Sequence, residues 1–151
     1  MIGEFAKFVL AAQFLTRLPL RTDRLFTAAR MAEAPRYFAL VGLLIGLVCT
    51  GIYWLAALVL PHLMAILIAM GTSLLLTGAF HEDGLADTFD GIGGGLNKAR
   101  ALEIMKDSRL GTYGAAALFM ALALKAGALF ALPPVWVCTA LPMAHCLSRG
   151  S

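Results

Sequence analysis

The sequence has little charge. Aspartate, glutamate, lysine and arginine make up 14% of its 151 residues, whereas 60% of the residues are hydrophobic. Typical soluble domains carry about 25% charged and about 45–50% apolar residues. A soluble domain of this length buries only about 70% of the surface that its unfolded chain exposes, so it could not cover so much apolar surface. The composition therefore excludes ordinary soluble, disordered and collagen-like chains and indicates a membrane protein.

Cysteine is also scarce. Cys49, Cys138 and Cys146 lie in apolar runs and have neither the spacing of a disulfide framework nor that of a zinc site. We interpret them as small buried hydrophobic residues.

Long runs without charge predict the membrane-spanning segments. Residues 37–80 contain no Asp, Glu, Lys or Arg, which is enough for two spans of about 20 residues divided at Pro61. The last apolar run stops at Arg149 as if a helix were cut, so we expect an N-terminal part of a longer protein. We predict an all-α, multi-pass helical bundle in one integral-membrane domain, 1–151. Its segments are spans at about 38–60, 63–80 and 110–132, a partial span at 135–148, and a helix at 2–15 that is interfacial or re-entrant rather than a signal peptide.

The basic residues predict which side of the membrane the connections face. The net charge is +3, but no basic patch with interleaved aromatics is present, so we expect lipid contacts and no nucleic-acid partner. The connection at Pro61 and the one at Pro133 carry no Lys or Arg. By the positive-inside rule, both basic segments face the cytoplasm. These segments contain Arg17, Arg21, Arg24, Arg30 and Arg36 in one, and Lys98, Arg100, Lys106 and Arg109 in the other.

Acidic residues gather in one cytoplasmic connection, residues 81–109. It holds six of the nine acids: Glu82, Asp83, Asp87, Asp90, Glu103 and Asp107. The spacing of Asp83, Asp87 and Asp90 places all three on one face of a helix. Mg²⁺ prefers one or two carboxylates completed by water and substrate phosphates. We therefore predict a magnesium–diphosphate site here, with His81 as a candidate base or ligand; a solvated helix face is the alternative.

Glycines and a second helix follow the acids. The cluster 91–95 frees the backbone for positive φ, and its N–H groups at Gly93 and Gly94 are candidate phosphate contacts; a flexible hinge is the alternative. The pattern of apolar and charged residues in 97–109 predicts an amphipathic helix capped by Asn97. On this helix Glu103 and Asp107 would share a face. Lys98, Lys106 and Arg109 are candidate phosphate-binding cations.

Four elements resemble the cobalamin synthase family, the adenosylcobinamide-GDP ribazoletransferases. The run 78–91, GAFHEDGLADTFDG, carries the clearest likeness, and 101–114, ALEIMKDSRLGTYG, follows it. Residues 14–19, FLTRLP, and 37–42, YFALVG, resemble the family's N-terminal element and first-span entrance. The resemblance extends over essentially the whole chain, although family members continue well beyond this length.

The resemblance implies a magnesium-dependent, multi-pass transferase of the bacterial inner membrane. Adenosylcobinamide-GDP would react with α-ribazole or its 5′-phosphate, giving adenosylcobalamin or its 5′-phosphate and GMP at the end of cobalamin biosynthesis. A homo-oligomer, or association with other enzymes of corrinoid synthesis, stays open. The implied roles are Mg²⁺ ligands at Glu82, Asp83, Asp87 and Asp90, a second ion at Glu103 or Asp107, phosphate contacts at Arg17, Lys106 and Arg109, and a base that is Asp90 or His81.

Other membrane proteins place acids in similar patterns. CDP-alcohol phosphotransferases and aromatic prenyltransferases also use spaced aspartates, but the run from Asp83 to Asp87 lacks the Ala-Arg pair of the former. A transporter subunit would place its acids near the bilayer midplane between broken helices. The acids here follow the end of a predicted span.

Overall fold

The computed structural model describes residues 2–107 and 109–150, and all regular elements in these ranges are helices. The predicted all-α class is confirmed. The chain divides into two compact units, one formed by Met1–Gly78 with Leu129–Ser151 and the other by Ala79–Ala128.

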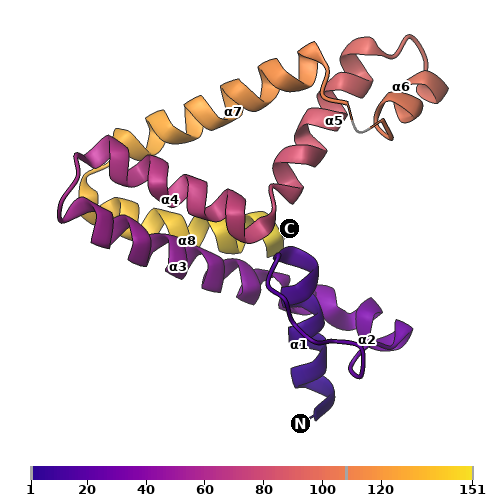
Figure 1. Ribbon diagram of the computed structural model, residues 1–151, viewed down its shortest axis with the longest axis horizontal. Coiled ribbons are helices and arrows are strands. Elements are labelled where there is room, and N and C mark those ends of the chain that lie inside the picture. The colour runs from indigo at the N-terminus through magenta and orange to yellow at the C-terminus, as the bar shows by residue number, and fades with distance from the viewer. Residues whose placement is uncertain (1, 108, 151) are drawn as a thin grey trace. The chain divides into compact units, whose positions relative to one another are not determined.

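The first unit contains most of the apolar helices (Figure 1). These are α1 (Ile2–Leu15), α2 (Ala28–Glu33), the short 3-10 helix η1 (Ala34–Tyr37), α3 (Phe38–Ala57), α4 (His62–Thr77) and α8 (Pro134–Gly150). The second unit holds α5 (Phe80–Gly94), α6 (Lys98–Ile104) and nearly all of α7 (Thr112–Phe130).

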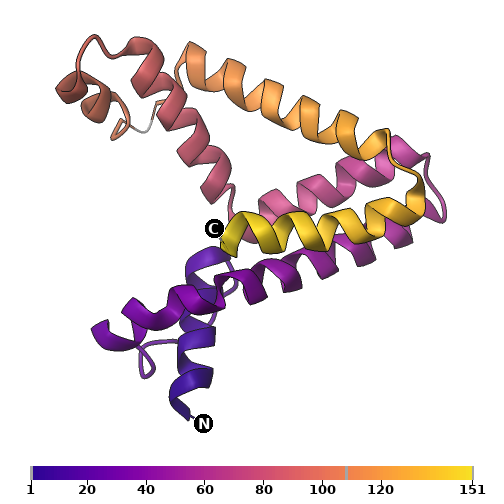
Figure 2. The same cartoon turned by 180° about the vertical axis from the view of Figure 1, so that it is seen from behind.

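Helix α3 packs along both α4 and α8, and the three run side by side in both views (Figure 1, Figure 2). Its contact with α8 depends on two glycines one turn apart. A Cβ at Gly42 would lie 2.2 Å from the His145 carbonyl oxygen, and one at Gly46 would lie 2.5 Å from the Pro142 Cα. Small residues allow helix backbones to approach closely within a membrane. The G-x-x-x-G spacing in α3 was the sequence signal for this contact.

Pro142 lies inside α8 and cannot donate to the carbonyl of Cys138, one turn earlier. Thr50 of α3 supplies a hydroxyl donor in place of the missing N–H. Its hydroxyl donates to the Gly46 carbonyl at 2.9 Å and also points at the Cys138 oxygen at 3.4 Å. A side-chain hydroxyl from a neighbouring helix therefore serves the backbone group that the proline leaves without a donor.

An ionic cluster joins α1 to α2 and η1. The Lys7 ammonium lies 2.6 Å from both Glu4 and Glu33, and the Arg36 guanidinium contacts the same two carboxylates at 3.2 and 2.9 Å. The Tyr37 hydroxyl also donates to Glu4, at 2.6 Å. Together these donors, Lys7 foremost, lower the pKa of Glu4 to about 2. Every charge in this cluster therefore has a partner.

The helices test the predicted spans. Two helical runs, Ala28–Ala57 and Thr112–Phe130, are long and apolar enough to cross a membrane, and α4 with α5 makes a third if they form one broken span. Among the described residues these two runs overlap the spans predicted at 38–60 and 110–132, and the span boundaries stay predictions. Helices α4 and α8 begin near their predicted starts but have only 16 and 17 residues. Helix α1 covers the helix predicted at 2–15, and its interfacial or re-entrant position stays a prediction.

Candidate functional site

Helix α5 carries most of the predicted site. The chain turns into it through two left-handed residues, Gly78 with φ 65° and Ala79 with φ 57°. From Phe80 to Gly94 the helix is continuous, so Asp83, Asp87 and Asp90 lie on one helix, as predicted. Four acidic residues and no lysine or arginine occur within it. This segment therefore concentrates negative charge.

Three of these acids have no cation beside them. Within the described residues, the carboxylates of Glu82, Asp83 and Asp87 take part in no hydrogen bond or ion pair. The Oε2 atom of Glu82 is moreover buried without a hydrogen-bond partner. Glu82 and Asp83 gain from the positive end of the helix dipole, because they lie in its first turn. A buried, unsatisfied carboxylate oxygen is costly unless a cation binds it.

Asp90, the fourth acid, is used differently. It is buried, and its two carboxylate oxygens accept hydrogen bonds from the backbone N–H groups of Gly111 (2.7 Å) and Gly114 (2.8 Å). These N–H groups belong to the start of α7, so Asp90 caps that helix from α5. A Cβ at either glycine would lie 2.3 Å from an Asp90 oxygen. The glycine spacing in LGTYG was the available signal for this contact.

The prediction of positive φ in the glycine cluster 91–95 is wrong. Among the described glycines, only Gly78 has a positive φ. Gly91 and Gly93 lie inside α5, and their missing side chains make room for neighbours. A Cβ at Gly91 would meet the Met105 side chain at 2.6 Å, and one at Gly93 the Tyr113 ring at 2.4 Å. Close packing explains glycine at these two positions better than phosphate contact or a flexible hinge, the two interpretations of the sequence.

Gly84 differs from those glycines. It also lies within α5, yet a Cβ there would meet no described atom within 4 Å. Glycine in a helix interior costs roughly 0.5–1 kcal/mol relative to alanine. Because no packing contact requires it, Gly84 leaves the helix surface open beside Asp83 and Asp87.

Helix α6 is shorter than predicted. Asn97 caps it as expected, accepting from the Arg100 N–H at 2.9 Å. The helix ends at Ile104, so the expectation that Glu103 and Asp107 share a helical face is wrong. Asp107 instead accepts from the backbone N–H of Arg109, a local bond that competes with helix continuation.

Both acids of this segment already have arginine partners. Glu103 pairs with Arg100 at 2.7 Å, and Asp107 pairs with Arg109 at 2.6 Å. The Arg109 side chain lowers the pKa of Asp107, and Asp107 in turn raises the pKa of Arg109. Lys106 is exposed and makes no ion pair with any described residue. Ser108 lies outside the described residues.

Arg17 and His81 complete the predicted set. Arg17 belongs to the first unit, where its backbone N–H donates to the Leu76 carbonyl at 2.8 Å. Its side chain lies over Gly78, at which a Cβ would come within 2.2 Å of the Arg17 Nε. His81 is exposed in the first turn of α5, and its ring meets Phe80 edge to face.

The acids of α5 are suited to a cation that takes its remaining ligands from water and substrate phosphates. No group of three or more His, Cys, Asp or Glu residues in the described ranges could hold a metal ion. Asp90 is engaged at α7, which leaves Glu82, Asp83 and Asp87. Mg²⁺ is usually held by one or two carboxylates, with water and substrate phosphates as its other ligands. The oxygen donors present suit that ion.

Comparison with known proteins gives one consistent result. The sequence profile described as cobalamin-5-phosphate synthase matches residues 7–151. The chain is 49% identical over 146 residues to the adenosylcobinamide-GDP ribazoletransferase of Vibrio parahaemolyticus, covering 95% of this chain and 54% of the relative. It is 50% identical over 145 residues to the protein of that name from Shewanella frigidimarina, covering 94% and 56%.

The chain thus spans about half the length of the curated relatives it matches. No solved structure matches it.

Proposed function

The chain belongs to the cobalamin-5-phosphate synthase family, and we propose that the full protein joins adenosylcobinamide-GDP to α-ribazole or α-ribazole 5′-phosphate. A ribazole hydroxyl attacks the phosphorus that links cobinamide to GMP. The bond from this phosphorus to GMP breaks, GMP leaves with the electron pair, and the hydroxyl proton passes to a base. The product is adenosylcobalamin or its 5′-phosphate. The names of these relatives support this pair of substrates.

The observation that carries the proposal is the unpaired state of Glu82, Asp83 and Asp87 within the described part of the chain. Uncompensated carboxylates on neighbouring helical turns repel one another, and more strongly near a low-dielectric membrane. Binding a divalent cation between the protein and a substrate diphosphate removes that repulsion. An acidic helix of this kind is therefore suited to a nucleoside-diphosphate substrate.

We infer that Asp83 and Asp87, four residues apart on one face of α5, would hold Mg²⁺, with Glu82 as an alternative ligand. When bound, this ion neutralises charge on the diphosphate and on the departing GMP. These two side chains would orient the diphosphate, and Gly84 leaves the helix surface next to them open. Glu103 and Asp107 fall outside the proposed set because each is already paired with an arginine.

Phosphate binding and proton transfer are assigned to other groups. Lys106 is a candidate phosphate-binding cation, since its ammonium has no anionic partner among the described residues. Arg109 and Arg17 remain candidates, whereas Gly93 and Gly94 lie in the last turn of α5 and are better explained by the helix itself. Asp90 is better suited to positioning α7 than to accepting a proton, which leaves His81 as the candidate base.

We place α5 and α6 on the cytoplasmic side of the inner membrane. The positive-inside rule supports this orientation, because the basic residues lie in the two connections that share that side. Labelling of single cysteines at exposed Lys98 and at exposed Pro133 with a membrane-impermeant thiol reagent in intact cells tests it. Labelling of the Lys98 position but not of the Pro133 position would contradict it.

The reaction itself is tested with the purified full-length protein in lipid vesicles. We expect GMP release from adenosylcobinamide-GDP only when α-ribazole or its 5′-phosphate and Mg²⁺ are both supplied, with one corrinoid product formed per GMP. Release that proceeds equally without the ribazole substrate would show hydrolysis and contradict the transfer. Failure of Mg²⁺ chelation to slow release would contradict the metal role.

A further inference from the structure

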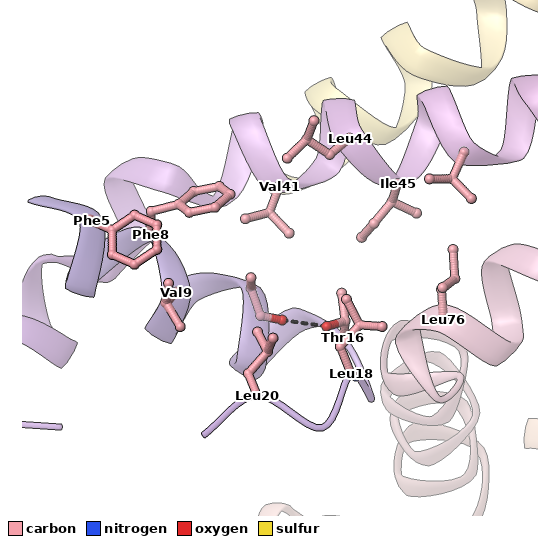
Figure 3. A pocket seen from close by; sticks show the side chains of 12 residues that line it. Phe5, Phe8, Val9, Thr16, Leu18, Leu20, Val41, Leu44, Ile45 and Leu76 are labelled. Carbon is pink, nitrogen blue, oxygen red and sulfur yellow. Dashed lines mark hydrogen bonds between the residues drawn. The ribbon is translucent and has the colours of Figure 1, made fainter. Parts of the chain in front are cut away.

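An apolar pocket lies in the first unit, and none of the residues that line it has a part in the proposed reaction. Its volume is about 290 Å³, and twelve residues from α1, α3, the end of α4 and the segment after α1 line it (Figure 3). Thr16 supplies the one polar side chain in this lining, and its hydroxyl is already donated to the Ala12 carbonyl at 2.6 Å. The pocket thus offers a ligand hydrocarbon contact only.

The position of the pocket along α3 corresponds to one leaflet of a bilayer. Its lining residues in α3 run from Val41 to Val48. At 1.5 Å per residue, Val48 lies about 15 Å from the start of α3, which is half of the roughly 30 Å hydrocarbon core. Phe5, Leu18, Leu44 and Val48 line the pocket and are also exposed at its mouth. A chain of methylene groups within that leaflet could enter it from the side.

Unpaired arginines follow the lining segment of this pocket in the sequence. Leu18 and Leu20 form part of its lining, and Arg21 follows directly in the sequence. Arg21 and Arg24 line a second cavity of about 630 Å³ together with Asp23 and Leu25. Both arginines are exposed, and neither forms an ion pair or side-chain hydrogen bond with a described residue. Arg36, by contrast, is held by Glu4 and Glu33.

We propose that this pocket binds an anionic phospholipid, with one acyl chain between α1 and α3 and the headgroup phosphate at Arg21 and Arg24. Charge complementarity supports this occupant, because in the second cavity two guanidinium groups outweigh the single carboxylate of Asp23. Guanidinium groups pair well with phosphate oxygens, and basic residues beside a membrane attract anionic lipids. A neutral lipid would fill the pocket but leave these arginines without a counter-charge.

Photo-crosslinking of a lipid probe tests this proposal directly. The full-length protein is placed in phosphatidylcholine vesicles that contain a phosphatidylglycerol probe with a diazirine on one acyl chain. After irradiation, we expect adducts on pocket residues of α1 and α3, such as Val9, Leu44 and Val48. Unlabelled phosphatidylglycerol should compete, whereas additional phosphatidylcholine should not.

Three variants separate the contribution of the arginines from that of the pocket. R21Q/R24Q should lower pocket adducts by about fivefold for each arginine removed, as expected for about 1 kcal/mol per basic residue. K98Q/R100Q removes the same charge from the other basic connection and should leave them unchanged. A12L fills the pocket with a good helix former and should lower the adducts, with helix content by circular dichroism as its control.

The readout is a covalent adduct, so it does not depend on catalytic turnover and is independent of the proposed reaction. Adducts spread evenly over all lipid-facing helices, or equal labelling in R21Q/R24Q and the parent protein, would overturn the proposal. Displacement of the probe by α-ribazole 5′-phosphate would assign the pocket to a substrate instead. Absence of pocket adducts in the full-length protein would show that another segment covers the pocket.

Discussion

Glu4 and Glu33 in the first unit and the acids at the start of α5 in the second unit differ in their charge pairing. In the first unit, Glu4 and Glu33 share Lys7 and Arg36 in a closed cluster, with contacts of 2.6–3.2 Å. In the second unit, the acids at the start of α5 form no ion pair with a described residue. Lys106 belongs to the same unit and also forms no ion pair with a described residue. Ion pairs hold α1 against α2 and η1 in the first case, whereas the acids at the start of α5 lack such pairs among the described residues. Such a departure from local consistency is typical of a functional site.

The largest expected effect is on turnover. Asp87→Asn in the full-length protein should lower the rate of GMP release by roughly 10²–10³-fold, the usual cost of removing one electrostatic contact to a transition state. Its thermal stability should not fall, because the Asp87 carboxylate has no described partner to lose. The matched change in the first unit, Glu33→Gln, should keep the rate and slightly lower the melting temperature. Equal rates of GMP release in Asp87→Asn and Glu33→Gln would contradict the proposed difference between the acids of α5 and those of the ionic cluster.

The next effect is on folding of the second unit. Asp90→Ala removes the acceptor for two backbone N–H groups at the start of α7. Each N–H left without an acceptor costs about 1–3 kcal/mol. Asp90→Asn retains one accepting oxygen and should lose roughly half as much. Denaturation in a graded series of detergent mixtures measures both, and an unchanged midpoint for Asp90→Ala would contradict the capping role.

Glycines within α5 should respond in opposite directions. Gly93→Ala places a methyl group against the Tyr113 ring and should destabilise by about 1–3 kcal/mol, less if the ring swings aside. Gly84→Ala meets open space and should stabilise the helix by about 0.5–1 kcal/mol. If the diphosphate approaches at Gly84, the same variant should raise the KM for adenosylcobinamide-GDP. A stable Gly84→Ala variant with an unchanged KM would place the substrate elsewhere.

The smallest effect is the titration of the ionic cluster in the first unit. Because the pKa of Glu4 is lowered from 4.5 to about 2, its contribution is complete above pH 4.5 and is lost as the pH falls towards 2. The carboxyl carbon of Glu4 should therefore titrate near pH 2 by nuclear magnetic resonance. Lys7→Met removes the leading cause and should move the midpoint back towards 4.5. A parent midpoint already near 4.5 would mean that the cluster is open in solution.

Periodicity and charge placement predicted much of the fold. Uncharged runs and Pro61 located α3 and α4, and the spacing of Asp83, Asp87 and Asp90 predicted one helix there. Helix α6 was predicted too long because the bond from the Arg109 N–H to Asp107 is a local alternative that periodicity does not reveal. The glycine cluster was misread because glycine composition cannot distinguish free backbone conformation from close packing. Only the positions of Met105 and Tyr113 decide that.

Asp90 shows more clearly what the spacing of the acids cannot predict. Its spacing matches that of Asp83 and Asp87, so the sequence gives all three the same role. Its use depends on α7, which begins 22 residues later at Thr112 and brings Gly111 and Gly114 to its carboxylate. Tertiary contacts of this kind separate a structural acid from its ligand-binding neighbours, and no local rule contains them.

The central claim is that the unpaired acids of α5 hold a divalent cation against a diphosphate. Mn²⁺ is a spectroscopic substitute for Mg²⁺, and electron paramagnetic resonance of the full-length protein counts the bound ion in the presence of GDP. The account predicts one GDP-dependent Mn²⁺ site that is lost in Asp83→Asn/Asp87→Asn and retained in Glu4→Gln/Glu33→Gln. An unchanged Mn²⁺ site in the α5 variant would contradict it.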